Sequence, residues 1–197
     1  MSTRLLKAAD YRRKPWKNGG GETVEIAVFP QKATVADFDW RVSMATVASD
    51  GPFSSFPGID RTLSILEGDG LALDVEGRPP IVLTASDTPL AFPADAATSA
   101  TLLGGSITDL NVMTRRGAFA HSVRKRRIAG AQPLESRAQT MIVFCHKGSV
   151  VLTEGGGEAR LSALDTAIVT APENVMLTSD THADVFIAEI TAGPLVD

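Results

Sequence analysis

The segment WKNGGGETVEIAVF, residues 16–29, places a glycine-rich turn directly before an alternating apolar run. Its second half, 24–29, has the period of two that predicts a strand. Three consecutive glycines lose much backbone entropy on folding, so an ordinary strand entrance would avoid them. They suit a backbone that turns through positive φ or lets another group approach closely. A plain glycine-rich turn is the alternative interpretation.

Similar alternation recurs along most of the chain and is broken by Gly, Pro, Asp and Asn. This pattern is typical of an all-β sandwich or barrel. The clearest examples are residues 40–44, 63–66, 71–75, 109–113 and 150–153. Only Thr3 through Tyr11 suggests a short turn of helix.

Three segments in the same order carry a resemblance to a known family: WKNGGGETVE, DFDWRVSMATVASDGPFSSFPGIDRTLSILEGDGLAL and DLNVMTRR. Together they resemble the HutD/Ves family, whose members have a cupin-type double β-barrel. The resemblance implies a bacterial protein that takes part in the control of histidine utilisation. It also implies that the protein binds a small metabolite of that pathway.

An internal repeat predicts two fused copies of one module. LTASDT at 83–88 matches LSALDT at 161–166 with an offset of 78. Gly68 and Gly148 differ by 80, and Pro93 and Pro172 differ by 79. Cupins place an aspartate and then a proline at comparable turns. We therefore expect a bicupin built from two β-barrel or jelly-roll modules.

The expected boundaries follow from the repeat. The N-terminal module, with the candidate pocket, covers residues 1–116, and a basic crossover covers 117–138. The C-terminal module covers 139–197, and strands from the N-terminal segment can pack with it.

Composition indicates a globular, cytoplasmic protein. The chain has 197 residues, of which 44% are hydrophobic and 21% charged, and a single cysteine, so an intramolecular disulfide is excluded. The basic N-terminus lacks the apolar core of a signal peptide. No window approaches 18 consecutive apolar residues, so we expect no membrane partner.

Two basic clusters lie within a net charge of −4. Residues 1–17 and 115–127 each contain six Lys or Arg. Nucleic-acid binding is one interpretation, because phosphate neutralisation dominates that affinity. Neither cluster has a recognition-helix pattern or interleaved aromatics, so solvated connecting segments are the favoured interpretation and no nucleic-acid partner is expected.

The sequence favours a protein without metal or other cofactor. Metal-binding cupins use a His-x-His pair, a nearby Glu and a later His, whereas His121, His146 and His182 are far apart here. Cys145 lies in the apolar run 141–145, where a thiol is normally an inert packing group. No catalytic residue is assigned.

Polar pairs spaced by two residues predict a ligand-binding face, because residues i and i+2 of a strand share one face. Four such pairs are Thr23/Glu25, Arg41/Ser43, Thr62/Ser64 and Asp109/Asn111. In a small barrel such faces can line a cavity. The predicted ligand-binding residues are Trp16, Lys17, Asn18, Gly19, Thr23, Arg41, Ser43, Phe53, Phe56, Arg61, Asp109 and Asn111.

Arginines in such a pocket suit bidentate recognition of carboxylates. We therefore predict a metal-free protein that senses or sequesters a small anionic metabolite. The family resemblance points to urocanate or formylglutamate and to a moderating effect on histidine utilisation.

Two rival functions remain open. A metal-independent isomerase or epimerase acting on a small carboxylate or sugar would use Lys17, Asp109 or Glu25 for acid–base chemistry. A protein-interaction module would instead expose Trp16, Phe53 and Phe56 as an apolar patch. A homodimer is compatible with all three functions, and the C-terminal module is expected to be a scaffold or a dimerisation surface.

Overall fold

A computed structural model describes residues 2–16 and 19–193. The described chain is almost entirely β-strand, with one short 3-10 turn, η1 (Ala8–Asp10). None of its helices is long and apolar enough to cross a membrane. The chain divides into two compact units. Unit 1 contains residues 2–11 and 121–192, and unit 2 contains residues 12–120 with Gly193.

Unit 2 contains two antiparallel sheets. The first has the order β2-β3-β4-β11-β6-β9 and the second the order β5-β10-β7-β8. Their strands are β2 (Arg12–Pro15), β3 (Gly21–Phe29), β4 (Trp40–Val47), β5 (Gly51–Pro52), β6 (Ile59–Glu67), β7 (Leu71–Val75), β8 (Ile81–Leu83), β9 (Leu90–Pro93), β10 (Thr98–Leu102) and β11 (Ile107–Arg115).

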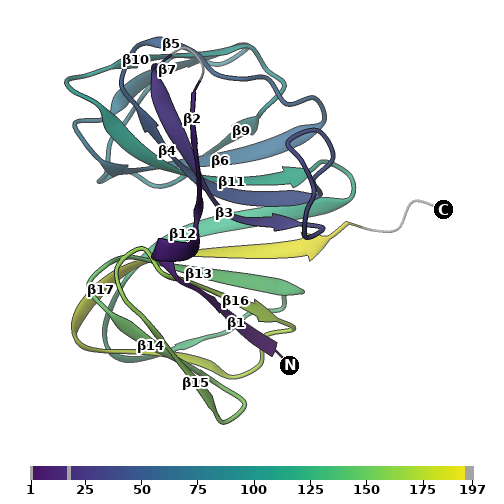
Figure 1. The fold of residues 1–197 in the computed structure, drawn as a ribbon, viewed down its shortest axis with the longest axis vertical. Helices are drawn as coiled ribbons and strands as arrows, with labels where there is room; N and C mark the ends of the chain where they lie inside the picture. The colour runs from purple at the N-terminus through teal and green to yellow at the C-terminus, as the bar shows by residue number, and fades with distance from the viewer. Residues whose placement is uncertain (1, 17–18, 194–197) are drawn as a thin grey trace. The chain divides into compact units, whose positions relative to one another are not determined.

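An apolar core joins the two sheets of unit 2. Alternate residues of β6 and β11, such as Leu63, Ile65 and Ile107, pack with Leu71 and Leu73 of β7. In Figure 1, β5, β7 and β10 lie on one side of this unit, opposite β4, β6 and β11. The arrangement is a sandwich in which apolar residues of the two sheets face each other across this core.

Unit 1 is built on one seven-stranded sheet with the order β1-β16-β13-β17-β14-β15, and β12 pairs with β17 outside this path. Its strands are β1 (Ser2–Leu6), β12 (Phe119–Leu134), β13 (Thr140–Lys147), β14 (Val150–Glu154), β15 (Gly157–Leu161), β16 (Thr166–Thr170) and β17 (Val175–Ala192). Its core contains Ile128, Val143, Leu152, Val169 and Val185.

The helical turn expected within Thr3–Tyr11 is confirmed only for Ala8–Asp10. Residues 2–6 form β1, which pairs antiparallel with β16 from Ser2 opposite Thr170 to Leu6 opposite Thr166. Only Ala8–Asp10 turns, as the 3-10 element η1. The long-range pairing outweighs a weak local helical preference. The segment 117–138, expected to be a crossover, is mostly the regular strand β12.

The sequence repeat coincides with a repeated pairing pattern. β6 pairs with β9 and β11, and β13 pairs with β16 and β17. In each copy an aspartate accepts a hydrogen bond from the backbone N–H three residues before it, and this bond caps the turn that precedes a strand. Asp87 Oδ2 accepts from the Thr84 backbone N–H at 2.8 Å, and Asp165 Oδ2 accepts from that of Ser162 at 2.9 Å.

Gly148 lies in a tight turn of unit 1 where the backbone of another segment comes very close. Its φ is +81°, and a Cβ built there would overlap the carbonyl oxygen of His182. We expect Gly148→Ala to lower the free energy of unfolding by well over the roughly 1 kcal/mol that a left-handed backbone alone costs an L-residue.

The matched control is Gly156→Ala in the same unit. Gly156 has a similar φ of +84°, but nothing lies within 4 Å of a Cβ placed there. Denaturant unfolding of the two variants separates backbone strain from close approach. Equal losses of stability would show that the contact with His182 is unimportant.

Candidate functional site

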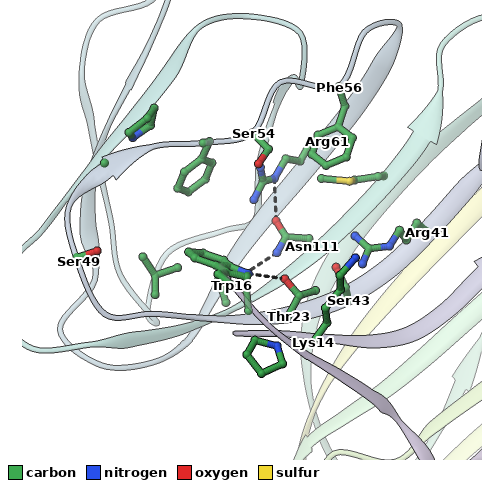
Figure 2. A pocket seen from close by; sticks show the side chains of 18 of the residues that line it. Lys14, Trp16, Thr23, Arg41, Ser43, Ser49, Ser54, Phe56, Arg61 and Asn111 are labelled. Carbon is green, nitrogen blue, oxygen red and sulfur yellow. Dashed lines mark hydrogen bonds between the residues drawn. The ribbon is translucent and has the colours of Figure 1, made fainter. Parts of the chain in front are cut away.

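The candidate site is a cavity of about 500 Å³ within unit 2. Strands β4, β6 and β11 present one common face to it, because directly paired residues of neighbouring strands point to the same side. Asn111 lies opposite Ser43 and Leu63, and Met113 lies opposite Arg41 and Arg61. The two arginines therefore flank β11, and their side chains point into the cavity (Figure 2).

Each arginine is held through its Nε atom. Arg41 Nε donates to Glu25 Oε2 at 3.0 Å, and Arg61 Nε donates to Asn111 Oδ1 at 2.7 Å. Both residues are only 8% exposed. Among the described residues, neither guanidinium donates from its Nη atoms to a protein acceptor. Within the described part of the chain, the Nη groups are therefore the uncommitted donors of the two side chains.

Aromatic rings hold the Arg61 guanidinium in place. Its central carbon lies 4.5 Å from the centre of the Phe53 ring and 5.6 Å from that of Phe92. A cation over the face of an aromatic ring is favourable, and more so where water is excluded. Phe53 and Phe92 thus compensate part of the cost of burying this charge.

A buried relay connects Arg61 to a carboxylate. Asn111 accepts from Arg61, as described above, and its Nδ2 donates to Asp109 Oδ1 at 2.6 Å. Asp109 is 1% exposed, and its second oxygen, Oδ2, is buried without a hydrogen-bond partner among the described residues. The relay fixes the orientation of the Asn111 amide and leaves one acceptor atom unsatisfied.

Burial dominates the electrostatics of the relay. It raises the pKa of the Asp109 carboxyl to about 6, against the opposing effects of Arg61, of Asn111 and of the Ala45 backbone. The Ala45 amide does not reach hydrogen-bond geometry with Oδ2. Burial likewise lowers the pKa of Arg61 to about 10; Asp109 opposes this shift and Arg41 adds to it. Arg61 is therefore charged at neutral pH.

The glycine-rich turn builds the aromatic wall of the cavity. Trp16 N–H donates to the Gly21 carbonyl at 2.9 Å, and Trp16 Nε1 donates to Thr23 Oγ1 at 2.8 Å (Figure 2). A Cβ on Gly21 would overlap the Thr46 carbonyl oxygen and lie 3.1 Å from the Trp16 ring. Glycine is needed at position 21 for this close approach.

The HutD family model matches residues 8–187. The chain belongs to the HutD family. It is 36% identical over 156 residues to an uncharacterized 21.2 kDa protein in the hutC 3′ region of Pseudomonas putida, a match covering 79% of this chain and 80% of that protein. It is 42% identical to protein Ves of Citrobacter koseri over 58% of this chain and 61% of the relative.

Solved structures give the same family and fold. A conserved protein of unknown function from Pseudomonas aeruginosa PAO1 superposes with a TM-score of 0.90 at 32% identity, over 97% of this chain and all of that one. HutD from Pseudomonas fluorescens SBW25 gives 0.82 at 30% identity, over 98% of this chain and all of the other. YhhW from Escherichia coli, at 10% identity and 0.70 over 99% of each chain, shares the cupin-like all-β fold.

Most of the predicted site residues of this HutD-family chain lie together at the cavity. They are Trp16, Thr23, Arg41, Ser43, Phe53, Phe56, Arg61, Asp109 and Asn111. Gly19 lies in the turn but does not line the cavity, and Lys17 and Asn18 lie outside the described residues.

Two details of the polar faces are wrong. Thr62 and Ser64 were expected on the polar face, but Arg61 points into the cavity, so its alternate neighbours point to the opposite side of the sheet. In β3 the register shifts between Glu25 and Ala27, so Val28, opposite Arg41, joins the face of Thr23 and Glu25. A β-bulge of this kind cannot be read from alternation.

The apolar-patch interpretation of the aromatics is not supported by their environment. Trp16, Phe53 and Phe56 are half-buried, and each packs against a core cluster of unit 2. Asp60, a potential partner of Arg61, pairs instead with Arg116 at 2.8 Å. Arg61 is thereby free to join the relay.

Several lining residues were missed. Ala45 and Met113 continue the alternation of Ser43 and Asn111, and extending the period-two pattern would have found them. Lys14 lines the cavity from β2, and Asp50 and Ser54 line it from the segment after β4. No periodicity marks these three, because their position depends on strand pairing and on loop path.

Other chemistry-bearing residues lie elsewhere. In the described part of the chain no group of three or more His, Cys, Asp or Glu residues is placed to hold a metal ion. Cys145 is buried in unit 1, where burial raises the pKa of its thiol to about 11. The Cys145 thiol is therefore a packing group at neutral pH.

The Asp109 carboxyl makes stability depend on pH in a defined direction. Its pKa is raised from 3.8 to about 6 on folding, so the native state binds the proton more tightly than the unfolded state. Ionisation between these values destabilises the fold as pH rises. We expect Asp109→Asn, which cannot ionise, to gain about 2 kcal/mol relative to the wild type between pH 4.5 and 7.5.

Denaturant unfolding at the two pH values measures this difference. Asp74→Asn, at an exposed position of β7 in the same unit, controls for general effects of removing a carboxylate. A stability difference for Asp109→Asn that does not change with pH would contradict the burial argument.

Proposed function

We propose that this HutD-family protein binds a small carboxylate metabolite in the cavity of unit 2 and so senses or sequesters it. The observation that carries the proposal is the pair of buried guanidiniums, Arg41 and Arg61, which are held through Nε and whose Nη groups have no acceptor among the described residues. Planar guanidinium groups match carboxylates in two-point hydrogen bonding. Fixing them before the ligand arrives lowers the entropic cost of binding.

The positive and negative charges of the site nearly balance one another. Arg41 is paired with Glu25 at 3.0 Å, and Arg61 is coupled through Asn111 to Asp109. The exposed Lys14 at the rim adds a third cation, and Asp50 adds an acidic group. The deep part of the cavity thus offers donors without a large excess of positive charge.

The link to histidine utilisation comes from the family and from the relative in the hutC 3′ region. We therefore take urocanate and formylglutamate as the first candidate ligands and a moderating effect on histidine catabolism as the role. The cavity volume of about 500 Å³ suits molecules of this size. A cytoplasmic location belongs to the same proposal.

We further propose that the two units are two cupin modules of a bicupin. The recurring strand pairing and the equivalent Asp87 and Asp165 turns support this relation. In this proposal unit 2 holds the ligand and unit 1 provides a scaffold or a dimerisation surface.

Catalysis on a small carboxylate is the second candidate function. The pKa of Asp109, about 6, is close to the range that a general base at neutral pH requires. A metal-independent isomerisation would use Asp109 to remove a proton from the bound substrate.

Titration of a carboxylate panel by calorimetry tests the binding proposal. We expect saturable binding at micromolar levels for at least one compound, and a loss of roughly 10- to 100-fold in affinity in Arg41→Gln, because a charge-assisted hydrogen bond is removed. The matched control is Arg13→Gln. Arg13 also pairs with a glutamate of β3, Glu22 at 2.8 Å, but does not line the cavity.

Absence of binding across a broad panel, or an equal effect of both substitutions, would contradict the proposal. The thermal unfolding midpoint of each ligand-free variant shows whether a loss of affinity reflects a loss of folding.

Product analysis separates the binder from the enzyme. For a binder, each compound is recovered unchanged after hours with stoichiometric protein. Conversion by the wild type that disappears in Asp109→Asn would establish the enzyme instead.

A further inference from the structure

We propose that Asp109 selects ligands that carry an N–H donor in addition to their carboxylate. This inference rests on the proposed carboxylate site and adds a second requirement to its ligand. The geometry that points to it is the unsatisfied Oδ2 atom of a side chain that lines the cavity and is 1% exposed.

An unsatisfied buried acceptor needs a donor from the ligand. Oδ1 of Asp109 already accepts from Asn111 at 2.6 Å, and the Asn111 amide oxygen is occupied by Arg61 at 2.7 Å. Asn111 therefore cannot turn to supply a second donor. A buried polar atom left without a partner is costly, so a ligand that satisfies it gains affinity over one that does not.

No donor of the described residues, the Ala45 backbone N–H included, reaches hydrogen-bond geometry with Oδ2. On the neighbouring strands Asp109 lies opposite Ala45 of β4 and Ile65 of β6, both with apolar side chains. The small Ala45 side chain also lines the cavity. The donor must therefore come from what occupies the cavity.

One small molecule can meet both requirements, a carboxylate for the two arginines and an N–H for Asp109. The relay from the Arg61 guanidinium to Asp109 consists of two hydrogen bonds and one amide group. We therefore expect one short ligand to reach both groups, with its carboxylate on the arginine Nη groups and its N–H on Asp109. Amides and imidazoles attached to a short carboxylic acid have this arrangement, whereas plain aliphatic acids have no donor for Asp109.

Charge balance favours the same class. A ligand with only a carboxylate would bring a third negative charge to a site that already holds those of Glu25 and Asp109, against two buried guanidiniums. A ligand N–H directed at Oδ2 offsets that repulsion with a charge-assisted hydrogen bond. Specificity then comes from the group that Asp109 requires, because a site built to bond an N–H rejects the analogue that lacks it.

Two matched ligand pairs test this requirement by calorimetry at pH 7.5. The first is urocanate against 3-(3-furyl)acrylate, in which a furan replaces the imidazole ring. The second is N-formylglutamate against N-formyl-N-methylglutamate. In whichever pair binds, we expect the wild type to prefer the N–H member by at least about tenfold.

In Asp109→Asn, the amide oxygen accepts from Asn111 in place of Oδ1, so an NH2 donor takes the position of Oδ2 and we expect the preference to fall to near unity. Asp74→Asn, at an exposed position of β7, keeps the wild-type preference as the matched control. Equal binding of both members by the wild type would overturn this inference and leave the carboxylate site standing. A preference that persists in Asp109→Asn would remove Asp109 from the assignment.

Failure of all four compounds to bind would refute the proposed ligands, and this inference with them. The preference within each pair is measured on the wild type, so that part of the test does not depend on the folding of any variant.

Discussion

The burial of two guanidiniums and one carboxylate on a single sheet face is the constraint on which the site depends. Each of these charges is costly to remove from water unless it is paired and hydrogen-bonded. The structure meets this cost with the Arg41–Glu25 pair, the Asn111 bridge and the Phe53 ring. Among the described residues it leaves two kinds of group uncommitted, the guanidinium Nη atoms and Asp109 Oδ2, and in our proposal these define the chemistry of the ligand.

Strand β11 brings these buried charged residues together. This strand pairs with β4 on one side and β6 on the other, so residues of three strands meet across it in fixed rows. Asp109, Asn111 and Met113 lie on its cavity face, and the apolar Leu110 and Val112 are buried on the other. A one-residue slip of register would exchange the two faces and destroy the site.

Alternation in the sequence was enough to predict an all-β fold and most of the cavity face. Arg41/Ser43 and Asp109/Asn111 were found because each pair interrupts an otherwise apolar strand. Alternation does not determine the structure where strand pairing decides it. Residues 3–6 became a strand because β16 offers an edge, and Thr62 and Ser64 point away because register places Arg61 in the cavity. The hydrogen bond between Arg61 and Asn111 could not be predicted from alternation, because it joins residues 50 positions apart in the chain.

A crystal structure of the protein with the tightest-binding carboxylate tests the central claim most directly. The account predicts that the ligand carboxylate contacts the Nη groups of Arg41 and Arg61, that Asn111 still bridges Arg61 and Asp109, and that a ligand N–H lies on Asp109 Oδ2. A ligand bound outside this cavity, or bound within it without touching either arginine, would contradict the account.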